Sequence, residues 1–378
     1  MSPPPLSPDR RIPPSASAPT RLLLLTEFFY DFSTFRLTLE SLAGIYAGRG
    51  HRVATAGRSD PRVPRAAVAG ASWEKTYRIG SSSRKLPALL AGADAVHLHT
   101  AGSWSPILSN LADARSDRPL VVTFQDWENP ELPANDARAR PAWTRLIKRA
   151  SAVTAVSRGL AERLGRALPS VARRLLVIPN GVDDTLFHKT TAPARASRRP
   201  FILCPARLAA YKGIDVLLMA WKDVGPELDS VELVFCGPDH SQGRFQRLAR
   251  LLGLSSRTRF IGAVGRKKMS ELMRDCLFVV LPSRRESFGI VALEAMASAK
   301  AVLATRTDGP SDLVSHESTG LLVEPGRVEP LRDGLLLLGK NARLRERLGR
   351  AGLERAPGFR WERVADSYLP LYAAARAQ

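Results

Sequence analysis

Two glutamates in one segment have the side chains best suited to ligand chemistry. The segment PSRRESFGIVALEAMA spans residues 282–297 and places Glu286 and Glu294 eight positions apart. A wholly helical path would separate their backbones by about 12 Å, which is too far for a paired acid and base. The spacing suits two hydroxyl-bearing rings at opposite ends of a diphosphate. Taken alone, it also fits solvated glutamates that flank an ordinary helix.

The elements around this segment predict an anion site. A buried strand over 277–281 leads into a polar loop, and an amphipathic helix is expected over 288–297. Open α/β proteins bind ligands at the carboxyl ends of their parallel strands. A helix that begins at this edge offers free N–H groups and a partial positive charge, which suit a phosphate.

Two cations follow a second strand end. The segment CPARLAAYKG, residues 204–213, places Arg207 and Lys212 in a strand-to-helix loop, and Gly237 lies in a third loop at the same edge. Two cations beside a helix N-terminus could neutralise a diphosphate leaving group without a metal ion.

Several other kinds of site are disfavoured by the motifs. No G-x-G-x-x-G follows the first predicted strand, and the chain has no Walker loop and no Asp-x-Asp tripeptide. None of the six histidines has a metal-ligand spacing. His97 and His99 alternate at one strand end, where a histidine is more often structural. We therefore expect no cofactor, neither a metal ion nor a nicotinamide.

Apolar runs alternate with amphipathic stretches and predict the elements that position these residues. The predicted strands are 21–26, 51–56, 95–100, 120–124, 152–157, 175–180, 201–206, 231–237, 260–264, 277–283, 301–305 and 320–325. The predicted helices include 34–47, 104–113, 157–166, 214–223 and 288–297. Continuous apolar runs are typical of parallel strands covered on both faces. The pattern indicates an α/β protein with two Rossmann-like, doubly wound domains that face each other across a cleft.

The domain boundaries follow from composition. The predicted parts are a disordered Pro-rich leader (1–20), an N-terminal domain (21–187), a linker (188–200), a C-terminal domain (201–358) and a terminal helix that crosses back to the first domain (359–378). In that helix Trp361, Val364, Tyr368 and Tyr372 recur at helical spacing, which predicts a core-facing stripe.

Charge and cysteine content bound the partners and the compartment. The net charge is +20 and the sequence pI is about 10.8, which favours phosphates, nucleic acid or an anionic membrane as partners. Nucleic acid is not expected, because no surface of interleaved aromatic and basic residues is evident. Three well-separated cysteines predict buried, reduced thiols. With no secretory signal before Arg21 and no spanning segment, a cytoplasmic location is predicted.

A basic helical stretch leaves a membrane contact open. In ARARPAWTRLIKRA, residues 137–150, Trp143, Leu146, Ile147 and Ala150 share one face. This face could rest on an anionic inner-membrane surface as a peripheral contact. Packing on the first domain's sheet is the favoured interpretation, because the stretch is short for an anchor.

The motifs together resemble a known family. E-S-F-G-I-V-A-L-E, from Glu286 to Glu294, is the E-x7-E signature of the retaining family 4 glycosyltransferases of the GT-B fold. Six further segments match in order: GRGHRV (48–53), ADAVHLH (93–99), SAVTAVSRGL (151–160), VIPNGVD (177–183), ARLAAYKG (206–213) and GLLVEPG (320–326). The resemblance extends from Arg21 to the C-terminus.

This resemblance implies a reaction. A hexose-type sugar would move from a nucleotide diphosphate, a UDP-sugar being favoured over GDP-mannose, to a hydroxyl of a glycan, lipid-linked or small-molecule acceptor. The product would carry an α-linkage, and no metal would be needed. The N-terminal domain would bind the acceptor.

It also implies residue roles. Glu286 would hold hydroxyls of the donor sugar and Glu294 those of the ribose, while Arg207 and Lys212 would bind the diphosphate. The amides near Ser287, Phe288 and Gly289 would contact the sugar, and those of Ile290 and Val291 the phosphate; Gly237 would line the donor site.

The first half departs from the family pattern. The usual glycine pair after the first strand is missing, and Ser33 and Thr34 occupy its approximate position. Gln125 stands where a histidine that contacts the reacting sugar is common, and it cannot carry a proton; His99 is a further candidate contact. Two functions stay open: an active transferase with an atypical sugar or acceptor, or a degenerate homologue that binds nucleotide-sugar or a partner. The intact second-half residues favour activity.

Overall fold

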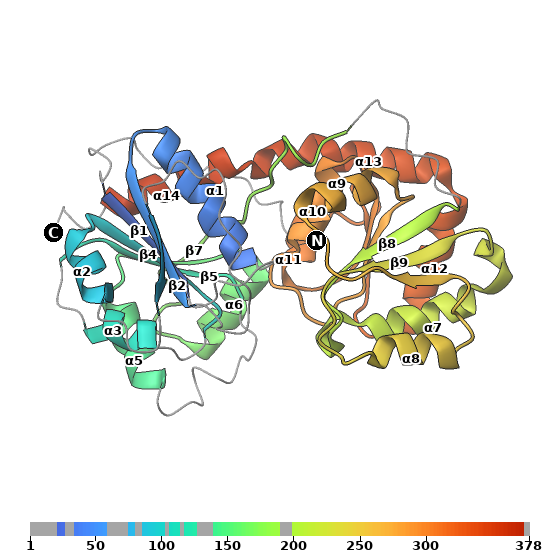
Figure 1. The fold of residues 1–378 in the computed structure, drawn as a ribbon, viewed down its shortest axis with the longest axis horizontal. Helices are drawn as coiled ribbons and strands as arrows, with labels where there is room; N and C mark the ends of the chain where they lie inside the picture. The colour runs from blue at the N-terminus through green and yellow to red at the C-terminus, as the bar shows by residue number, and fades with distance from the viewer. Residues whose placement is uncertain are drawn as a thin grey trace. The chain divides into compact units, whose positions relative to one another are not determined.

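The computed structural model describes residues 21–26, 34–58, 75–79, 85–102, 106–113, 117–126, 139–189 and 199–373. The chain forms two compact units, the first comprising the chain up to Gly181 together with Trp361 onward, the second comprising Val182–Arg360 (Figure 1). The first unit therefore ends six residues before the predicted boundary at 187. The expected leader and residues 190–198 of the expected linker lie outside the described residues.

The first unit is built on a seven-stranded sheet in the order β3-β2-β1-β4-β5-β6-β7. The strands are β1 (Arg21–Thr26), β2 (Arg52–Arg58), β3 (Lys75–Ile79), β4 (Ala95–Thr100), β5 (Leu120–Phe124), β6 (Ala152–Ala155) and β7 (Leu175–Val177). The helices described are α1 (Thr34–Gly48), α2 (Lys85–Gly92), α3 (Pro106–Asp113), α5 (Ala139–Arg149), α6 (Arg158–Ala167) and α14 (Trp361–Ala373). All neighbouring strands are parallel, as the apolar runs predicted.

The C-terminal helix α14 packs into this first unit. Its predicted stripe is core, since Trp361, Val364, Tyr368 and Tyr372 are all nearly inaccessible. The hydroxyl of Tyr46 on α1 donates to the backbone oxygen of Ala365 over 3.1 Å.

Helix α5 also uses its apolar face inside the unit. Trp143, Leu146, Ile147 and Ala150 are all buried, and the Trp143 ring packs 5.3 Å from that of Phe124 on β5. Packing on the sheet, the favoured of the two interpretations, is confirmed. The apolar face is therefore not available to a membrane.

The second unit contains a six-stranded parallel sheet in the order β10-β9-β8-β11-β12-β13. Its strands are β8 (Phe201–Pro205), β9 (Glu232–Cys236), β10 (Thr258–Phe260), β11 (Val279–Leu281), β12 (Val302–Thr305) and β13 (Leu321–Val323). Its helices are α7 (Ile214–Val224), α8 (Arg244–Leu251), α9 (Arg266–Asp275), α10 (Ile290–Ala297), α11 (Asp308–Leu313), α12 (Val328–Lys340) and α13 (Ala342–Arg355), with 3-10 turns η1 (Ala210–Lys212), η2 (Gly225–Leu228) and η3 (Ala356–Phe359).

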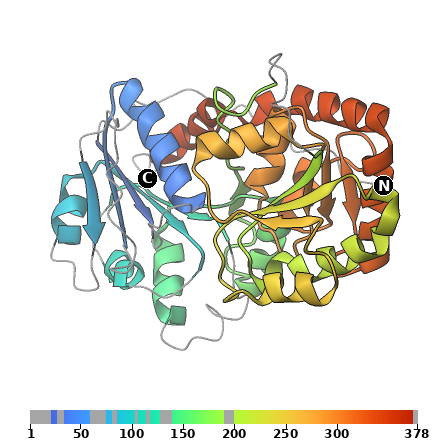
Figure 2. The same cartoon turned by 45° about the vertical axis from the view of Figure 1, so that its right-hand side comes forward.

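The helices of the second unit cover both faces of its sheet. In two views, α7 and α8 lie on one face while α9 and α10 lie on the other (Figures 1 and 2). One continuous core cluster joins strands such as β8 and β9 to α7 and α12. Burial on both faces explains why these strands lack the alternation of a half-exposed strand.

Several predicted boundaries were wrong. The strand expected at 260–264 is β10, at Thr258–Phe260, and the helix expected from Phe288 begins at Ile290. Strand β3, KTYRI, was not predicted, because it has no continuous apolar run. The first sheet therefore has seven strands rather than about six.

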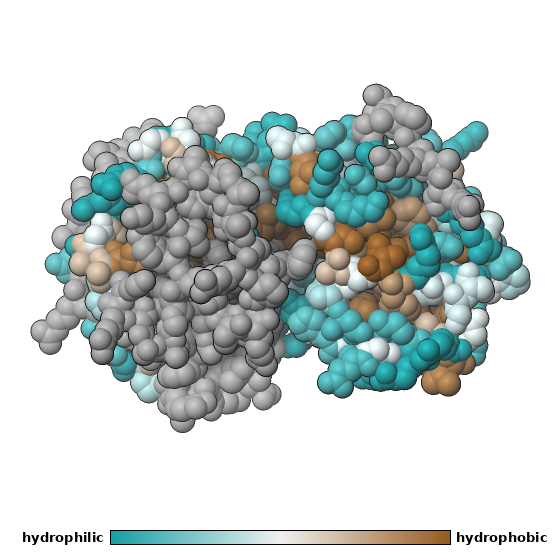
Figure 3. All heavy atoms as spheres, viewed as in Figure 1, coloured by the Kyte–Doolittle hydropathy of each residue, from teal (hydrophilic) through white to brown (hydrophobic). Residues whose placement is uncertain are grey.

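The hydropathy of the helices and the state of the three cysteines agree with the sequence analysis. Within the described residues, no helix is both long and apolar enough to cross a bilayer. On the face shown in Figure 3, the described part of the second unit is hydrophilic along its upper and lower margins and has an apolar area between them. Cys204, Cys236 and Cys276 are all buried and free. Burial raises the pKa of Cys236 to about 11 and that of Cys276 to about 12, so these thiols stay protonated.

Candidate active site

Three loops meet at the carboxyl edge of the second sheet. They follow β8, β9 and β11, which are neighbours in the sheet order. The loop after β8 carries Arg207 and Lys212, the loop after β9 carries Gly237, and the loop after β11 carries Glu286. Parallel pairing therefore brings the predicted second-half residues to one edge of one sheet.

Lys212 and Glu286 are in direct contact. The Lys212 Nζ lies 2.6 Å from Glu286 Oε2, and the two side chains are only 17% and 19% exposed. The residues are 74 positions apart in the chain. The structure thus joins the predicted phosphate-binding lysine to the predicted sugar-binding glutamate as a largely buried ion pair.

Gly213 lets this contact form. Its φ is +65°, and a Cβ built on it would lie 2.0 Å from the backbone oxygen of Pro282. Only glycine allows the end of η1 to approach the β11 loop so closely. Arg284 in the same loop makes two hydrogen bonds of 2.7 and 2.8 Å to the carboxylate of Asp215 on α7. The two loops are therefore fixed against each other.

The N-terminus of α10 opens at the same edge. Gly289 is the N-cap with φ +85° and provides no side-chain cap. Because this left-handed conformation cannot belong to the helix, α10 begins at Ile290 rather than at Phe288, where it was predicted to begin. The amides of Ile290 and Val291 lie in the first turn, where helices have no internal acceptors. Ser287 and Phe288 are buried before it, and the Gly309 amide donates to the Glu286 backbone oxygen over 3.0 Å.

Gly237 positions the loop of Arg207. A Cβ at Gly237 would lie 2.2 Å from the backbone oxygen of Ala206, and the Leu208 amide donates to the Pro238 oxygen over 2.9 Å. Burial, and to a smaller extent the positive charge of Arg207, lower the pKa of His240. Within the described residues no ion pair joins Arg207 to a carboxylate, so its charge is available to an anion.

Glu294 lies deep in α10 and is paired with a cation that the sequence analysis missed. Arg266 Nη1 is 3.0 Å from Glu294 Oε1. Burial outweighs the charge and hydrogen bond of Arg266, which lower the pKa of the Glu294 carboxyl, so that this pKa is raised to about 7. Arg266 is the first residue of α9, where a cation opposes the helix dipole. Three consecutive cations at the start of a helix, residues 266–268, were the sequence feature that could have suggested a compensating carboxylate nearby.

In the first unit, Gln125 and His99 are bonded to each other. Gln125 Nε2 donates to His99 Nδ1 over 3.1 Å, and Gln125 Oε1 accepts from Asn180 Nδ2 over 2.7 Å. Asn180 Oδ1 in turn accepts from Thr38 Oγ1 over 3.3 Å. Gln125 is thus a buried bridge between two polar neighbours, a role that its replacement of a histidine did not predict.

His99 keeps one unsatisfied nitrogen. Because Nδ1 accepts from Gln125, the proton of the neutral ring is on Nε2. Nε2 is buried at the end of β4 and has no hydrogen-bond partner in the described part of the chain. Burial lowers the pKa of His99 to about 3, so the ring is a neutral N–H donor.

His97 has a structural role, as expected. Its ring nitrogens lie 2.7 Å from the Tyr372 hydroxyl of α14 and 2.7 Å from Thr123 Oγ1 of β5. Thr34 is the first residue of α1, and its backbone oxygen accepts from Thr38 Oγ1 over 2.9 Å. Ser33, the other residue at the missing glycine pair, lies outside the described residues.

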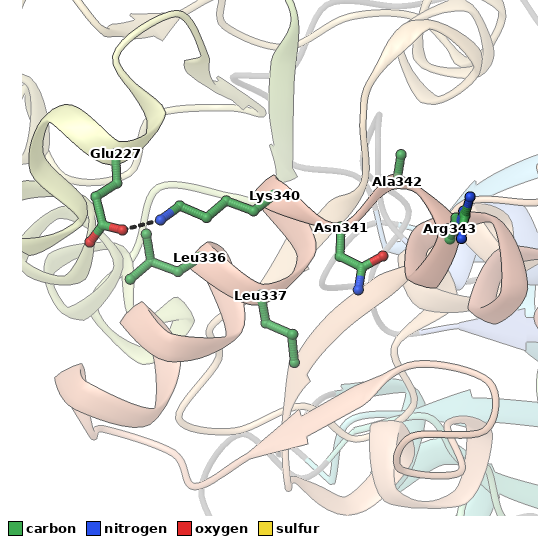
Figure 4. A pocket seen from close by; sticks show the side chains of 7 residues that line it. All are labelled: Glu227, Leu336, Leu337, Lys340, Asn341, Ala342 and Arg343. Atoms are coloured by element: carbon green, nitrogen blue, oxygen red, sulfur yellow. Dashed lines mark hydrogen bonds and ion pairs between the residues drawn. The ribbon is translucent and has the colours of Figure 1, made fainter.

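A hollow elsewhere in the second unit contains none of these residues. It has a volume of about 650 Å³ and is lined by Glu227, Leu336, Leu337, Lys340, Asn341, Ala342 and Arg343. Lys340 points across it to pair with Glu227 (Figure 4). Separately, no cluster of three or more metal-ligating side chains occurs among the described residues.

Comparison with known families assigns both halves of the chain. The profile of the glycosyl transferases group 1 family matches residues 189–355, and that of glycosyltransferase family 4 matches residues 38–186. A D-inositol 3-phosphate glycosyltransferase of Kribbella flavida is 32% identical over an alignment of 308 residues, which covers 75% of this chain and 71% of that protein. The match to a protein of the same name from Actinosynnema mirum, 34% identical, spans 54% of this chain and about half of that protein's length, 52%.

Solved structures share the fold. Sucrose-phosphate synthase from Thermosynechococcus elongatus superposes with a TM-score of 0.76 at 21% identity, covering 94% of this chain and 98% of that one. Anabaena HepE, solved in complex with UDP and glucose, gives a TM-score of 0.75 at 22% identity, covering 92% and 97%. Two Rossmann-like domains of the GT-B type are therefore the architecture of this chain.

Proposed function

The chain is a glycosyltransferase that belongs to family 4, and we propose that it transfers a sugar from a nucleoside diphosphate donor, with retention of the anomeric configuration. The observation that carries this proposal is the grouping of Lys212, Glu286 and the N-terminus of α10 at one sheet edge. A UDP-sugar is the favoured donor, and the UDP bound to HepE supports it.

The proposed chemistry needs charge at the leaving group. As the bond between the anomeric carbon and the phosphate oxygen breaks, Arg207, Lys212 and the first amides of α10 stabilise the growing negative charge on the diphosphate. The acceptor hydroxyl forms the new bond on the same face of the sugar, and its proton passes to the leaving phosphate oxygen. The product is an α-linkage, and no metal takes part.

Sugar and ribose hydroxyls would bind the two glutamates. Glu286 is already at the loop beside Lys212, and Glu294 is one to two turns inside α10, so the two carboxylates sit on either side of the helix start. In the first unit, the buried His99 Nε2–H, which has no partner among the described residues, would donate to a hydroxyl or phosphate oxygen of a bound ligand. The acceptor is a glycan, lipid-linked or small-molecule hydroxyl. The relatives' name makes a phosphorylated polyol the first small molecule to assay.

Calorimetric titration with UDP and with GDP, without added metal and at moderate ionic strength, tests the proposal. Saturable one-to-one binding of one nucleotide, in preference to the other, is expected. If neither nucleotide binds, the donor site is contradicted and a degenerate, partner-binding homologue becomes the better interpretation. If a nucleotide binds but its sugar is neither transferred nor hydrolysed, the protein binds nucleotide-sugar without catalysing transfer.

A further inference from the structure

We propose that Arg266 is a positioning residue that holds Glu294 as an oriented carboxylate for a pair of vicinal hydroxyls, the ribose of the donor nucleotide. The inference rests on the proposed function, because it assigns a ligand to Glu294. Arg266 lies outside the E-x7-E segment and outside the loops after β8 and β9. Its contact with Glu294 forms because α9 and α10 lie next to each other.

The contact is specific in geometry. Arg266 Nη1 lies 3.0 Å from Glu294 Oε1, and Arg266 Nη2 lies 3.9 Å from Asp183 Oδ2. The guanidinium also lies 5.1 Å from the centroid of the Phe187 ring. These three contacts, to α10 and to the segment that contains Asp183 and Phe187, hold the guanidinium and leave the Arg266 side chain 37% exposed. A planar guanidinium held in this way fixes the carboxylate that it pairs with.

Burial makes this pairing necessary. The Glu294 side chain is only 6% exposed, and a buried carboxylate without a partner takes up a proton. The charged groups that act on it are Arg266 from α9, which favours the carboxylate, and Asp183 from the segment entering the unit, which opposes it. Of these two, only Arg266 stabilises the form that accepts hydrogen bonds from hydroxyls.

The segment that precedes the second sheet supports the same arrangement. Ser270 Oγ on α9 donates to the Leu186 backbone oxygen over 2.7 Å, and the Val182 amide donates to the Phe359 oxygen over 2.8 Å. The first turns of α9 are therefore anchored to residues 182–187. This anchoring holds Arg266 against the dipole of its own helix, which otherwise disfavours a cation at that position.

The test compares a nucleoside diphosphate with its 2′-deoxy form. The dissociation constants of UDP and 2′-deoxy-UDP, or of GDP and 2′-deoxy-GDP if GDP is the nucleotide bound, are measured by calorimetry between pH 6 and pH 8.5. A hydroxyl bonded to a carboxylate is worth about 10-fold in affinity, so the wild type should prefer the ribonucleotide by about that factor at pH 8. The diphosphate has the same protonation in both ligands, so its pH dependence cancels in the ratio of the two dissociation constants.

The variants separate positioning from folding. Arg266→Gln should reduce the ratio toward one at pH 7 and restore part of it at higher pH, because Glu294 then loses its proton only in more alkaline solution. Arg266→Lys should retain most of the wild-type ratio, and Glu294→Gln should give a ratio near one at every pH. Arg259→Gln removes the ion pair between the half-exposed Arg259 and Glu232 in the same unit and should leave the ratio unchanged.

Two failures can be told apart. If the wild type binds neither nucleotide, the proposed function fails. If the wild type prefers the ribonucleotide and Arg266→Gln keeps the same ratio with the same pH dependence, the role of Arg266 is overturned while the donor site stands. Thermal unfolding of each variant, monitored by circular dichroism, verifies that the binding data come from folded protein.

Discussion

Lys212 and Glu286 neutralise each other across 2.6 Å in a largely buried pair, so a donor must exchange this contact for its own. The diphosphate would attract Lys212 while sugar hydroxyls donate to Glu286, and each partner would gain a new bond for the one it loses. Arg207 differs, because no described carboxylate pairs with it. The pair and the single cation are therefore expected to respond differently to substitution.

Replacing either cation should slow transfer. Arg207→Ala and Lys212→Ala should each reduce turnover by roughly 10²–10³, the cost of losing one preorganised group at a developing charge. Lys212→Ala also removes the ion-pair partner of Glu286, so it should weaken donor binding as well. Turnover and KM with the identified donor give the two effects. Lys222→Ala, at an exposed position on α7, is the matched control and should leave turnover unchanged. Near-wild-type turnover in both Arg207→Ala and Lys212→Ala would contradict the proposed site.

Gln125→His tests whether the unusual residue suits this enzyme. Gln125 donates to His99 and accepts from Asn180 at once, and an imidazole in its place cannot keep both bonds with the same geometry. We expect lower activity and a free energy of unfolding reduced by about 1–3 kcal/mol, the cost of a buried unsatisfied group. Steady-state rates and urea unfolding measure them. A gain in activity would mean that the site has partly decayed.

Loops, rather than helices or strands, determine the donor edge at the scale of elements. The η1 loop reaches the β11 loop because Gly213 has no side chain, and Arg284 ties the latter to α7 through Asp215. The left-handed Gly289 then sets where α10 begins. A substitution at one of these glycines should therefore lower the stability of the fold, although the glycine itself has no side chain to contact a ligand.

Gly213→Ala and Gly253→Ala form a matched pair. Both glycines have positive φ, +65° and +71°, but only Gly213 would place a Cβ against backbone, while Gly253 has open space. Gly253→Ala should lower the free energy of unfolding by about 1–2 kcal/mol through conformation alone. Gly213→Ala should lower it by a further roughly 1–3 kcal/mol through the clash. Urea unfolding compares them, and equal losses would refute the close approach of the two loops.

Titratable groups of the two units respond to pH with opposite signs at the scale of the molecule. Burial lowers the pKa of His99 to about 3 and that of His97 well below its usual value. The unfolded chain binds their protons below about pH 6.5, so their contribution to stability is complete above that pH and is lost as the pH falls. Glu294, whose pKa is raised to about 7, contributes stability at low pH that is lost as the pH rises through 7.

Acid should therefore destabilise the protein through its histidines. Between pH 6.5 and pH 5 the expected loss is about 2 kcal/mol for each buried histidine. Urea unfolding of the wild type and of His99→Asn across this range gives the two slopes. The variant should have the shallower slope, and identical slopes would contradict a neutral, buried His99 in the folded state.

The fold class could be predicted because it depends on patterns within short stretches of chain. Apolar runs and turn signals predicted most strands. The spacing from Glu286 to Glu294, together with Arg207 and Lys212, predicted a nucleotide site at one sheet edge, and the structure groups these residues at the carboxyl edge of the second sheet. Strand β3 was missed, because KTYRI has no continuous apolar run and its alternation is limited to Tyr77 and Ile79. The exact start of α10 was missed, because a left-handed glycine is not visible in hydropathy.

The order of elements, the parallel α/β architecture and the family motifs were thus determined by the sequence itself, since local propensity and spacing belong to short stretches of chain. Only the tertiary structure decided the partners: Lys212 with Glu286 across 74 positions, Arg266 with Glu294 across 28, and Gln125 with Asn180 across 55. These contacts depend on strand order, register and helix packing, which bring distant side chains together. Their charges and burial, rather than their residue types alone, set what each of them can bind.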